Sequence, residues 1–218
     1  MITKATLSKD GRYYITEAAP APLARVSTIL ACAPKDGLVS WWRKVGFSEA
    51  DRVSKTSTDL GTRVHAACEA IDLGLPYEMD PEVDPHVEAW RRFKDEYVDT
   101  VEAIEYFVCS LTHQYGGTVD RRLRLKDGRR VIGDIKTSKT LNATYGIQLI
   151  AYEEAEVEMG LERCDGRMVI NLPSNNPGKY GVKWYEDPDD WIAFRALNFT
   201  FRYFRDREDD WKRGIRLV

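Results

Sequence analysis

The sequence predicts an α/β protein in which helices flank a central mixed β-sheet with an antiparallel meander, as in restriction endonucleases. Three segments rich in β-branched and aromatic residues, at 104–112, 118–125 and 130–137, are separated by glycine-bearing turns. Segments with helical periodicity lie before, between and after the predicted strands. A sheet with helices in all these places buries both of its faces, which defines the α/β layer arrangement.

Length and composition predict one globular domain. The chain has 218 residues, of which 43% are hydrophobic and 31% are charged. A chain of this length forms one domain or at most two small ones. Because it contains neither a repeat nor a low-complexity linker, we treat 1–218 as one unit. Its first part, about 20–100, is mainly helical, and about 101–218 holds the sheet with its flanking helices.

No segment is predicted to enter a membrane. The longest stretch without Asp, Glu, Lys or Arg, 106–119, is shorter than the roughly 20 apolar residues that a bilayer helix needs. The first residues lack the apolar stretch of a secretory signal. We therefore expect a soluble cytoplasmic protein with no membrane partner, located in the bacterial host cytoplasm if a phage encodes it.

The first half is predicted to be mainly helical after a short hairpin formed by 2–7 and 12–16. Ser27 is a suitable cap for a first short helix, and Gly74 ends the third helix. The predicted helices are 27–32, 37–45, 59–73 and 84–99.

After the meander, the second half alternates helices and strands. Asn142 caps a predicted helix over 143–159, and Gly160 ends it. Strands are predicted at 167–172 and 179–185. The segment Asp187-Pro188-Asp189-Asp190 begins a long final helix. The apolar residues of that helix expected in the core are Trp191, Phe194, Leu197, Phe201 and Phe204.

The four cysteines are predicted to be buried thiols. Cys32, Cys68, Cys109 and Cys164 form no CxxC pair and have no nearby histidines at zinc-ligand spacing. An iron–sulfur cluster on residues so widely separated is the less favoured alternative.

Basic residues are concentrated in one segment of an otherwise acidic chain. The net charge is −3, yet residues 121–139 hold eight basic and two acidic side chains, a local excess of +6. A solvated hairpin is the simpler interpretation, and a polyanionic ligand is the alternative. The basic residues are Arg121, Arg122, Arg124, Lys126, Arg129, Arg130, Lys136 and Lys139.

The turn of the central hairpin decides which side chains face each other. A two-residue loop would put Asp120 opposite Ile135 and leave Asp120 and Asp134 on different faces. A three-residue loop, 126–128, whose glycine is left-handed, puts Asp120 opposite Asp134, and we predict this register. The accompanying pairs are Val119–Ile135, Leu123–Val131, Arg124–Arg130 and Leu125–Arg129. The side chains expected to face the core are Val119, Leu123 and Leu125, with Asp120, Arg122 and Arg124 on the other face.

Facing residues on neighbouring strands have their Cβ atoms about 5 Å apart, so the carboxylates of Asp120 and Asp134 would repel each other unless a positive charge lies between them. Lys136 follows Asp134 by two residues and so lies on the same face of the strand, where it supplies part of that charge. A hard divalent cation supplies it better, because carboxylate oxygens suit Mg²⁺ and Mn²⁺. From the hairpin alone, a surface salt bridge between Asp134 and Lys136 is the simpler interpretation.

Several short motifs between Val26 and Tyr152 stand in a distinctive order. They are Val26-Ser27-Thr28-Ile29-Leu30, Trp42 with Gly46, Gly61-Thr62-Arg63-Val64-His65 with Glu69, Tyr115-Gly116-Gly117-Thr118 before Asp120, Asp134-Ile135-Lys136, and Gln148-Leu149-Ile150-Ala151-Tyr152. This set resembles the RecB-type exonuclease branch of the PD-(D/E)xK nuclease superfamily, in the subgroup of phage exonucleases and the mitochondrial genome-maintenance exonuclease. Val119 stands in place of the proline of the superfamily motif. The cysteine cluster of the iron–sulfur members is absent from the sequence, so we expect no such cofactor.

The resemblance implies a role for each matching residue. A Mg²⁺ or Mn²⁺ ion would polarise the scissile phosphate and lower the pKa of a bound water. Lys136 would orient that water and stabilise developing charge, and Gln148 would help to place the lysine. The implied metal ligands are Asp120, Asp134, the carbonyl of Ile135 and His65. The resemblance also allows a second role for His65, in which it contacts the phosphate instead of the metal. The implied catalytic residues are Asp120, Asp134, Lys136 and Gln148.

Other residues match less specifically. Without the resemblance, His65 is interpreted as a capped or core histidine, Glu105 as a solvated edge residue, and Tyr152 as part of a helix that packs on the sheet. Trp41 and Trp42 either stack on bases or belong to the core. The implied DNA contacts are Arg122, Arg124, Lys139 and Tyr152, and the acids implied just outside the ligand set are Glu69 and Glu105.

Taken together, these residues predict a Mg²⁺- or Mn²⁺-dependent deoxyribonuclease. An exonuclease that acts on DNA ends or single strands in recombination, repair or replication is favoured over an endonuclease. The first alternative is a non-catalytic nucleic-acid-binding accessory protein that retains the fold, and the second is a phosphatase of small phosphoesters. Self-association and a recombination partner protein are left open by the sequence.

Overall fold

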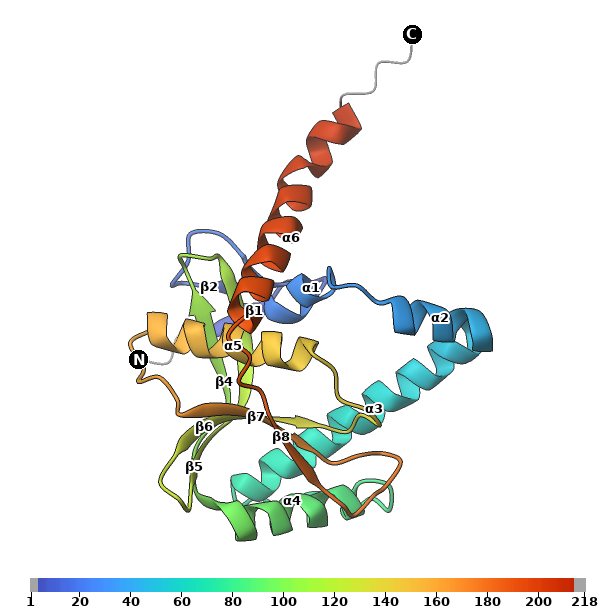
Figure 1. Cartoon of the computed structure of the whole chain (residues 1–218), viewed down its shortest axis with the longest axis vertical. Helices are drawn as coiled ribbons and strands as arrows, with labels where there is room; N and C mark the ends of the chain where they lie inside the picture. Colours follow the sequence, from blue (N-terminus) through green and yellow to red (C-terminus); the bar gives the residue numbers. More distant parts are fainter. Residues whose placement is uncertain (1–3, 214–218) are drawn as a thin grey trace.

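The computed structural model describes residues 4–213, without the side chains of 36, 38 and 208–213, and confirms the α/β fold class. An eight-stranded mixed sheet has helices on both faces (Figure 1). The elements in order are β1 (Ala5–Leu7), β2 (Tyr13–Thr16), β3 (Leu23–Arg25), α1 (Val26–Leu30), α2 (Asp36–Val45), α3 (Phe47–Asp72), α4 (Asp84–Tyr97), β4 (Val98–Ser110), β5 (Tyr115–Leu125), β6 (Arg130–Lys136), α5 (Thr144–Glu158), β7 (Gly166–Asn171), β8 (Gly181–Trp184) and α6 (Asp190–Arg213).

Strand β5 organises the sheet, because three strands pair with it. On one edge, β4 pairs with β5 antiparallel from end to end. The other edge is shared, since β3 pairs in parallel at 115–116 and β6 pairs antiparallel at 121–124. Between these two ladders, residues 117–120 face a gap in the described sheet. Because β3 and β6 diverge there, side chains at the end of β6 and on α5 can reach the backbone of β5.

The register of the β5–β6 hairpin agrees with the prediction. Leu123 pairs with Val131 and Arg124 with Arg130. The N–H of Leu125 donates to the carbonyl of Arg129 at 2.8 Å. Gly128 has φ +92°, the left-handed conformation that the three-residue loop requires. The same register, continued past the last paired residues, sets Asp120 level with Asp134.

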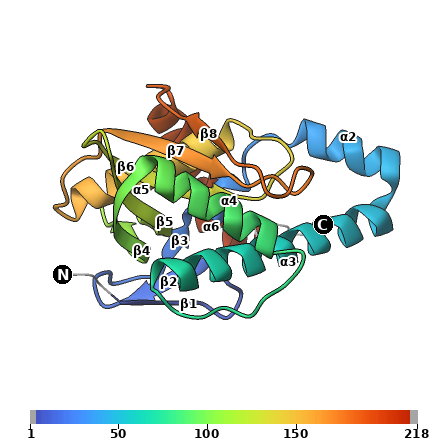
Figure 2. The same cartoon turned by 90° about the horizontal axis from the view of Figure 1, so that it is seen from below.

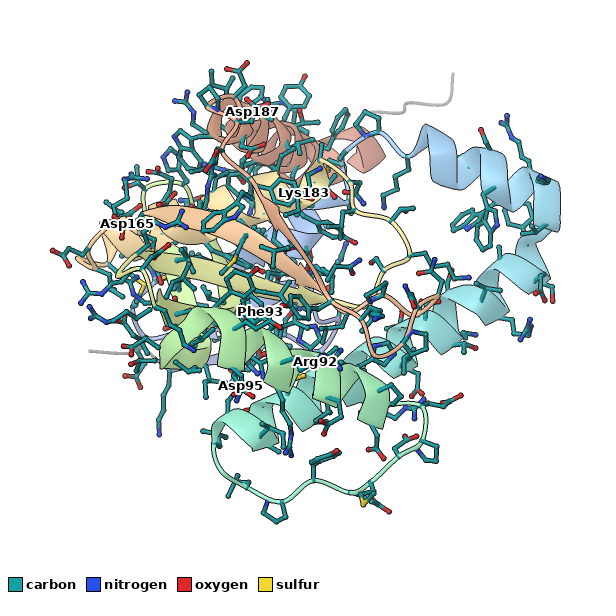
Figure 3. All side chains as sticks on the ribbon, turned by 60° about the horizontal axis from the view of Figure 1, so that its bottom comes forward. Arg92, Phe93, Asp95, Asp165, Lys183 and Asp187 are labelled. Atoms are coloured by element: carbon teal, nitrogen blue, oxygen red, sulfur yellow. The ribbon has the colours of Figure 1, made fainter. Side chains whose placement is uncertain are left out.

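Two hydrophobic cores lie on opposite faces of the sheet. On one face, Val64 of α3 and Phe93 of α4 pack with Leu123. On the other, Leu149 of α5 and Phe194 of α6 pack with Tyr115. Figure 2 shows α3 and α4 together on the near side of the sheet. In Figure 3, Phe93 lies against the sheet, whereas Arg92 and Asp95 are on the exposed side of α4.

Since both faces are covered, the expectation that Asp120, Arg122 and Arg124 share an outward face was wrong. Asp120 and Arg122 are buried, and Arg124 is half-buried. Alternation along one strand cannot reveal this, because the covering helix α5 is distant in sequence. Among the described helices, none is long and apolar enough to cross a bilayer.

Several predicted boundaries and burial states also differ. Helix α3 begins at Phe47 rather than Asp59, because its first turns are polar and are held by exposed pairs such as Arg52–Glu49 instead of a core face. Ser27 makes no cap hydrogen bond, and Arg25 is the N-cap of α1. Cys32 is exposed, whereas the other three cysteines are buried. Phe204 is 53% exposed, because the end of α6 extends beyond the body (Figure 1).

Candidate functional site

Three acids form a row across three adjacent strands. Glu105 of β4 lies opposite Asp120 of β5, since the pairs on either side are Ile104–Arg121 and Tyr106–Val119. On β6, Asp134 directly follows Gly133, whose partner Arg121 directly follows Asp120, so the continued register extends the row to Asp134. The exposed fraction is 9% for Asp120 and 1% for Asp134. Repulsion within this row has to be balanced by positive charge.

Asp120 bridges the gap between β5 and β6. Its Oδ2 accepts a hydrogen bond of 2.9 Å from the backbone N–H of Ile135. The same oxygen lies 3.4 Å from Nδ1 of His65. Asp120 therefore connects the edge of β5 with both β6 and α3.

His65 faces the row from α3. Its Nε2 donates to the carbonyl of Ile135 at 2.8 Å, so these two predicted ligands are hydrogen-bonded to each other. Burial lowers the pKa of His65, but a hydrogen bond that Glu105 accepts from the imidazole and the charge of Asp120 outweigh it and raise the pKa above its usual value. The imidazole thus places positive charge among the acids.

Asp134 and Lys136 form an ion pair at the inner end of the row. Burial raises the pKa of Asp134 to about 6, against the influence of Lys136. Burial lowers the pKa of Lys136, but the charges of Asp134 and Asp120 reverse this and raise it. The Lys136 ammonium also lies 5.3 Å over the ring of Tyr145.

Gln148 and Tyr152 support Asp134 from α5. Nε2 of Gln148 donates to Asp134 Oδ1 at 3.2 Å and to the hydroxyl of Tyr152 at 2.9 Å. The Tyr152 ring packs directly on β5, where a Cβ on Gly117 would lie 2.2 Å from the ring. This contact requires glycine at position 117 and explains part of the Gly116-Gly117 motif.

The residues present fit a hard divalent cation. Ligand atoms of His65, Glu105 and Asp120 all lie within 4.8 Å of one another. Oδ2 of Asp134 is buried and accepts no hydrogen bond from the described residues, its close contact being the ion pair with Lys136. Oxygen-rich sets of this kind suit Mg²⁺ and Mn²⁺. This group differs from the predicted one, because Glu105 enters it and Asp134 is held by Lys136.

Two hollows meet at Glu105. An open groove of about 490 Å³ runs between α3 and the end of β6. A smaller hollow of about 240 Å³ lies toward β2, β3 and α1. The groove is lined by Thr58, Gly61, Thr62, His65, Glu69, Lys136 and Ser138, and the smaller hollow by Tyr14, Arg25, Ser27, Thr118, Asp120, Gln148 and Tyr152.

The basic residues predicted to contact DNA fall into different environments. Arg122 is buried and ion-paired with Glu156 of α5, so it is unavailable to a phosphate, and its expected role was wrong. Arg124 is partly exposed and pairs with Glu102 at 2.8 Å. Lys139 is exposed in the loop after β6, and Glu69 lines the groove.

Sequence reasoning underestimated Glu105. It was expected just outside the ligand set or as a solvated edge residue, yet it lies beside Asp120 and His65. Its backbone φ of +44° is unusual for a residue with a side chain. The sequence of the predicted strand 104–112 does not reveal that Glu105 faces Asp120, because this pairing depends on the register that the turn at 111–114 sets between β4 and β5. Trp41 and Trp42 lie half-buried on α2.

No family model matches the chain. No curated protein matches it either. Among solved structures, the crystal structure of an alkaline exonuclease (LHK-Exo) from Laribacter hongkongensis is similar, with a TM-score of 0.39 and 14% sequence identity over 88% of this chain and 91% of that one.

Proposed function

We propose that this chain is a Mg²⁺- or Mn²⁺-dependent deoxyribonuclease of the PD-(D/E)xK type. The observation that carries the proposal is the row Glu105–Asp120–Asp134 with Lys136 at its end and His65 above it. Acids crowded in this way are costly unless a cation shares them. A structural salt bridge would need only one acid for one lysine.

The side chains of the site have separable tasks. Asp120 and Glu105, with His65, would hold the cation, which when bound polarises the scissile phosphate and lowers the pKa of a water. Lys136 is held by Asp134 and can orient that water while stabilising the negative charge that develops on the phosphate. Gln148 fixes Asp134, and the Tyr152 hydroxyl fixes Gln148.

A polymeric substrate with an accessible end fits the two hollows. The groove along α3 is open, whereas the hollow on the other side of Glu105 is about half its size and is bounded by Tyr14 and Tyr152. Positive charge for a phosphate backbone is supplied by Arg25 in the smaller hollow and by the exposed Lys139, which follows the groove residue Ser138 in sequence. We therefore favour an exonuclease, with roles in DNA recombination, repair or replication.

The test is digestion of end-labelled linear, circular and single-stranded DNA with Mn²⁺, Mg²⁺ or EDTA. The expected result is metal-dependent release of label from linear DNA, with circular duplex resistant. Asp134→Ala and Lys136→Ala should each lower the rate by about 100- to 1,000-fold or more, because Lys136→Ala removes positive charge at the reacting phosphate and Asp134→Ala removes the group that holds Lys136 in place.

Asp127→Ala is the matched control, since Asp127 is an exposed acid in the turn of the same hairpin. It should retain full activity. Full activity in the purified Asp134→Ala or Lys136→Ala chain would remove the catalytic assignment. DNA binding in EDTA without turnover in any metal would instead assign the chain to the non-catalytic binding proteins.

A further inference from the structure

Glu105 is held in a backbone conformation that needs support. Its φ is +44°, in the left-handed region that residues with a Cβ seldom adopt. Both of its neighbours in β4 remain paired with β5. The unusual conformation is therefore local to the residue whose carboxylate stands beside Asp120 and His65. The contacts that the Glu105 carboxylate makes therefore bear on how this backbone conformation is maintained.

Arg121 reaches Glu105 from inside the protein. It follows Asp120 on β5, and its side chain is fully buried. Its Nη1 donates to the Asp120 carbonyl at 2.6 Å and to Glu105 Oε1 at 3.4 Å. Its Nε donates to Oδ2 of Asp72 at 2.7 Å. One guanidinium therefore touches two residues of the acidic row and the last residue of α3.

The charges around Asp72 show why Arg121 acts on Glu105. Asp72 also accepts hydrogen bonds from Lys94 and from the indole of Trp90. Two cations on one buried carboxylate leave a surplus positive charge. Glu105 is the second acid within reach of Arg121, so it balances that surplus. A buried charge left without a partner would be costly, which ties the two residues together.

The network also spans the elements that build the site. Asp72 lies two helical turns after His65 on α3, while Lys94 and Trp90 lie on α4. Arg121 thus links the helix that carries His65 to the strand that carries Glu105. Its position relative to β4 is fixed by the β4–β5 ladder, and its position relative to α3 by the hydrogen bond to Asp72.

We propose that Arg121 is a positioning residue that holds the Glu105 carboxylate toward Asp120 and His65 for cation binding. This inference rests on the proposed function, because it assumes that the site binds Mg²⁺ or Mn²⁺. Arg121 is excluded from direct contact with solvent by its burial. It therefore acts through Glu105.

The experiment is a calorimetric titration of the metal-free full chain with Mn²⁺. The variants are Arg121→Lys, Glu105→Gln and the double variant, each first checked for folding by thermal unfolding. Arg121→Lys keeps the charge beside Asp72 but removes the fork that reaches Glu105. We expect it to weaken Mn²⁺ binding by about 10- to 100-fold, as removal of partners that orient metal ligands does.

In the Glu105→Gln background, Arg121→Lys should change the Mn²⁺ affinity by less than about twofold, because two residues that act in one step are not additive. Equal losses in both backgrounds, or no loss in either, would overturn the proposal. Arg124→Lys is the matched control on the same strand and should leave the affinity unchanged, since Arg124 pairs with Glu102 away from the site.

Two further outcomes are decisive. If neither Arg121→Lys nor Arg121→Gln folds, Arg121 is a stability residue and the positioning role is wrong. If the unmodified chain takes up no Mn²⁺, the nuclease proposal fails and this one fails with it. An Arg121→Lys chain that cleaves DNA and binds Mn²⁺ as tightly as the unmodified chain overturns only the positioning role.

Discussion

Two clusters of charged side chains adjoin on β5, and their charges are balanced in different ways. On the hairpin, Arg122, Arg124 and Arg130 pair with the acids Glu102, Glu156 and Glu162. In the site, the network contains the acids Asp72, Glu105, Asp120 and Asp134 and the permanent cations Lys94, Arg121 and Lys136. The remaining positive charge there comes from His65, whose pKa is raised above its usual value.

The difference separates a structural cluster from a candidate cation site. Guanidinium ions stay charged at every physiological pH, so the hairpin cluster is complete by itself. The proton on His65 can leave, and a metal ion can then take over its share of the balance. Three of the eight basic residues at 121–139 belong to the complete cluster, and Arg129, Arg121 and Lys136 are also ion-paired within the chain. The basic excess in the sequence therefore says little about a polyanionic ligand.

The largest expected effect is on the hairpin cluster. Arg122→Met should lower the free energy of unfolding by about 3–5 kcal/mol, because it leaves the buried Glu156 carboxylate without its cation. Urea denaturation measures it. The Mn²⁺ affinity of the folded fraction should not change, and Arg129→Met, at an exposed pair with Asp127, should cost little. A lost Mn²⁺ affinity would show that the two clusters are coupled.

The second effect is a pH dependence confined to the site. Asp134 has its pKa raised from 3.8 to about 6, so the metal-free folded state binds more protons than the unfolded chain between these values. Its contribution to stability should therefore fall by about 3 kcal/mol as the pH rises through this window. The raised pKa of His65 acts in the same direction at higher pH.

Urea denaturation without metal at pH 4, 5, 6 and 7 gives the free energy of unfolding of the unmodified chain and of Asp134→Asn. The difference between the two free energies at each pH is the quantity of interest. The variant should gain stability relative to the unmodified chain as the pH rises. A constant difference would mean that Asp134 ionises at its ordinary pKa.

Metal addition should reverse that trend. At a Mn²⁺ concentration 100 times the dissociation constant, ligand binding stabilises the folded state by about 2.7 kcal/mol. We expect a corresponding rise in the thermal midpoint at pH 7, reversed by EDTA and absent from Asp120→Asn. A rise of the same size in Asp120→Asn would place the ion outside the acidic row.

The smallest expected effect concerns Lys139. Because Lys139 is exposed and follows the groove residue Ser138, Lys139→Ala should weaken DNA binding modestly and reduce the slope of log Kobs against log salt by about 1, the value for one phosphate contact. Fluorescence anisotropy at several salt concentrations, in Ca²⁺ or EDTA, measures this. Lys126→Ala, at the far end of the hairpin, is the control and should leave the slope unchanged.

The register of the β5–β6 hairpin was predictable, because the turn is a local feature: Gly128 fixes the loop, and the loop sets the pairs from Arg124–Arg130 to Arg121–Gly133. The alternation of β5 was predicted wrongly, since Val119 packs in the core under α5 and α6 whereas Leu123 packs in the core under α3 and α4. The surroundings of Arg122 were not predictable in this way, because its partner Glu156 is 34 residues further along the chain. The same holds for Glu105, whose place depends on how β4 returns onto β5 and on buried contacts to α3.

The contact between Gly117 and Tyr152 restricts which residues can occupy these two positions in related sequences. Any side chain at position 117 would collide with the ring, and one at position 116 would meet Phe107 at 2.9 Å. Natural variants that retain this fold are therefore expected to conserve glycine at 117 whenever an aromatic residue stands at 152. A lineage that loses the ring would be free to lose the glycine as well, so the two positions should change together.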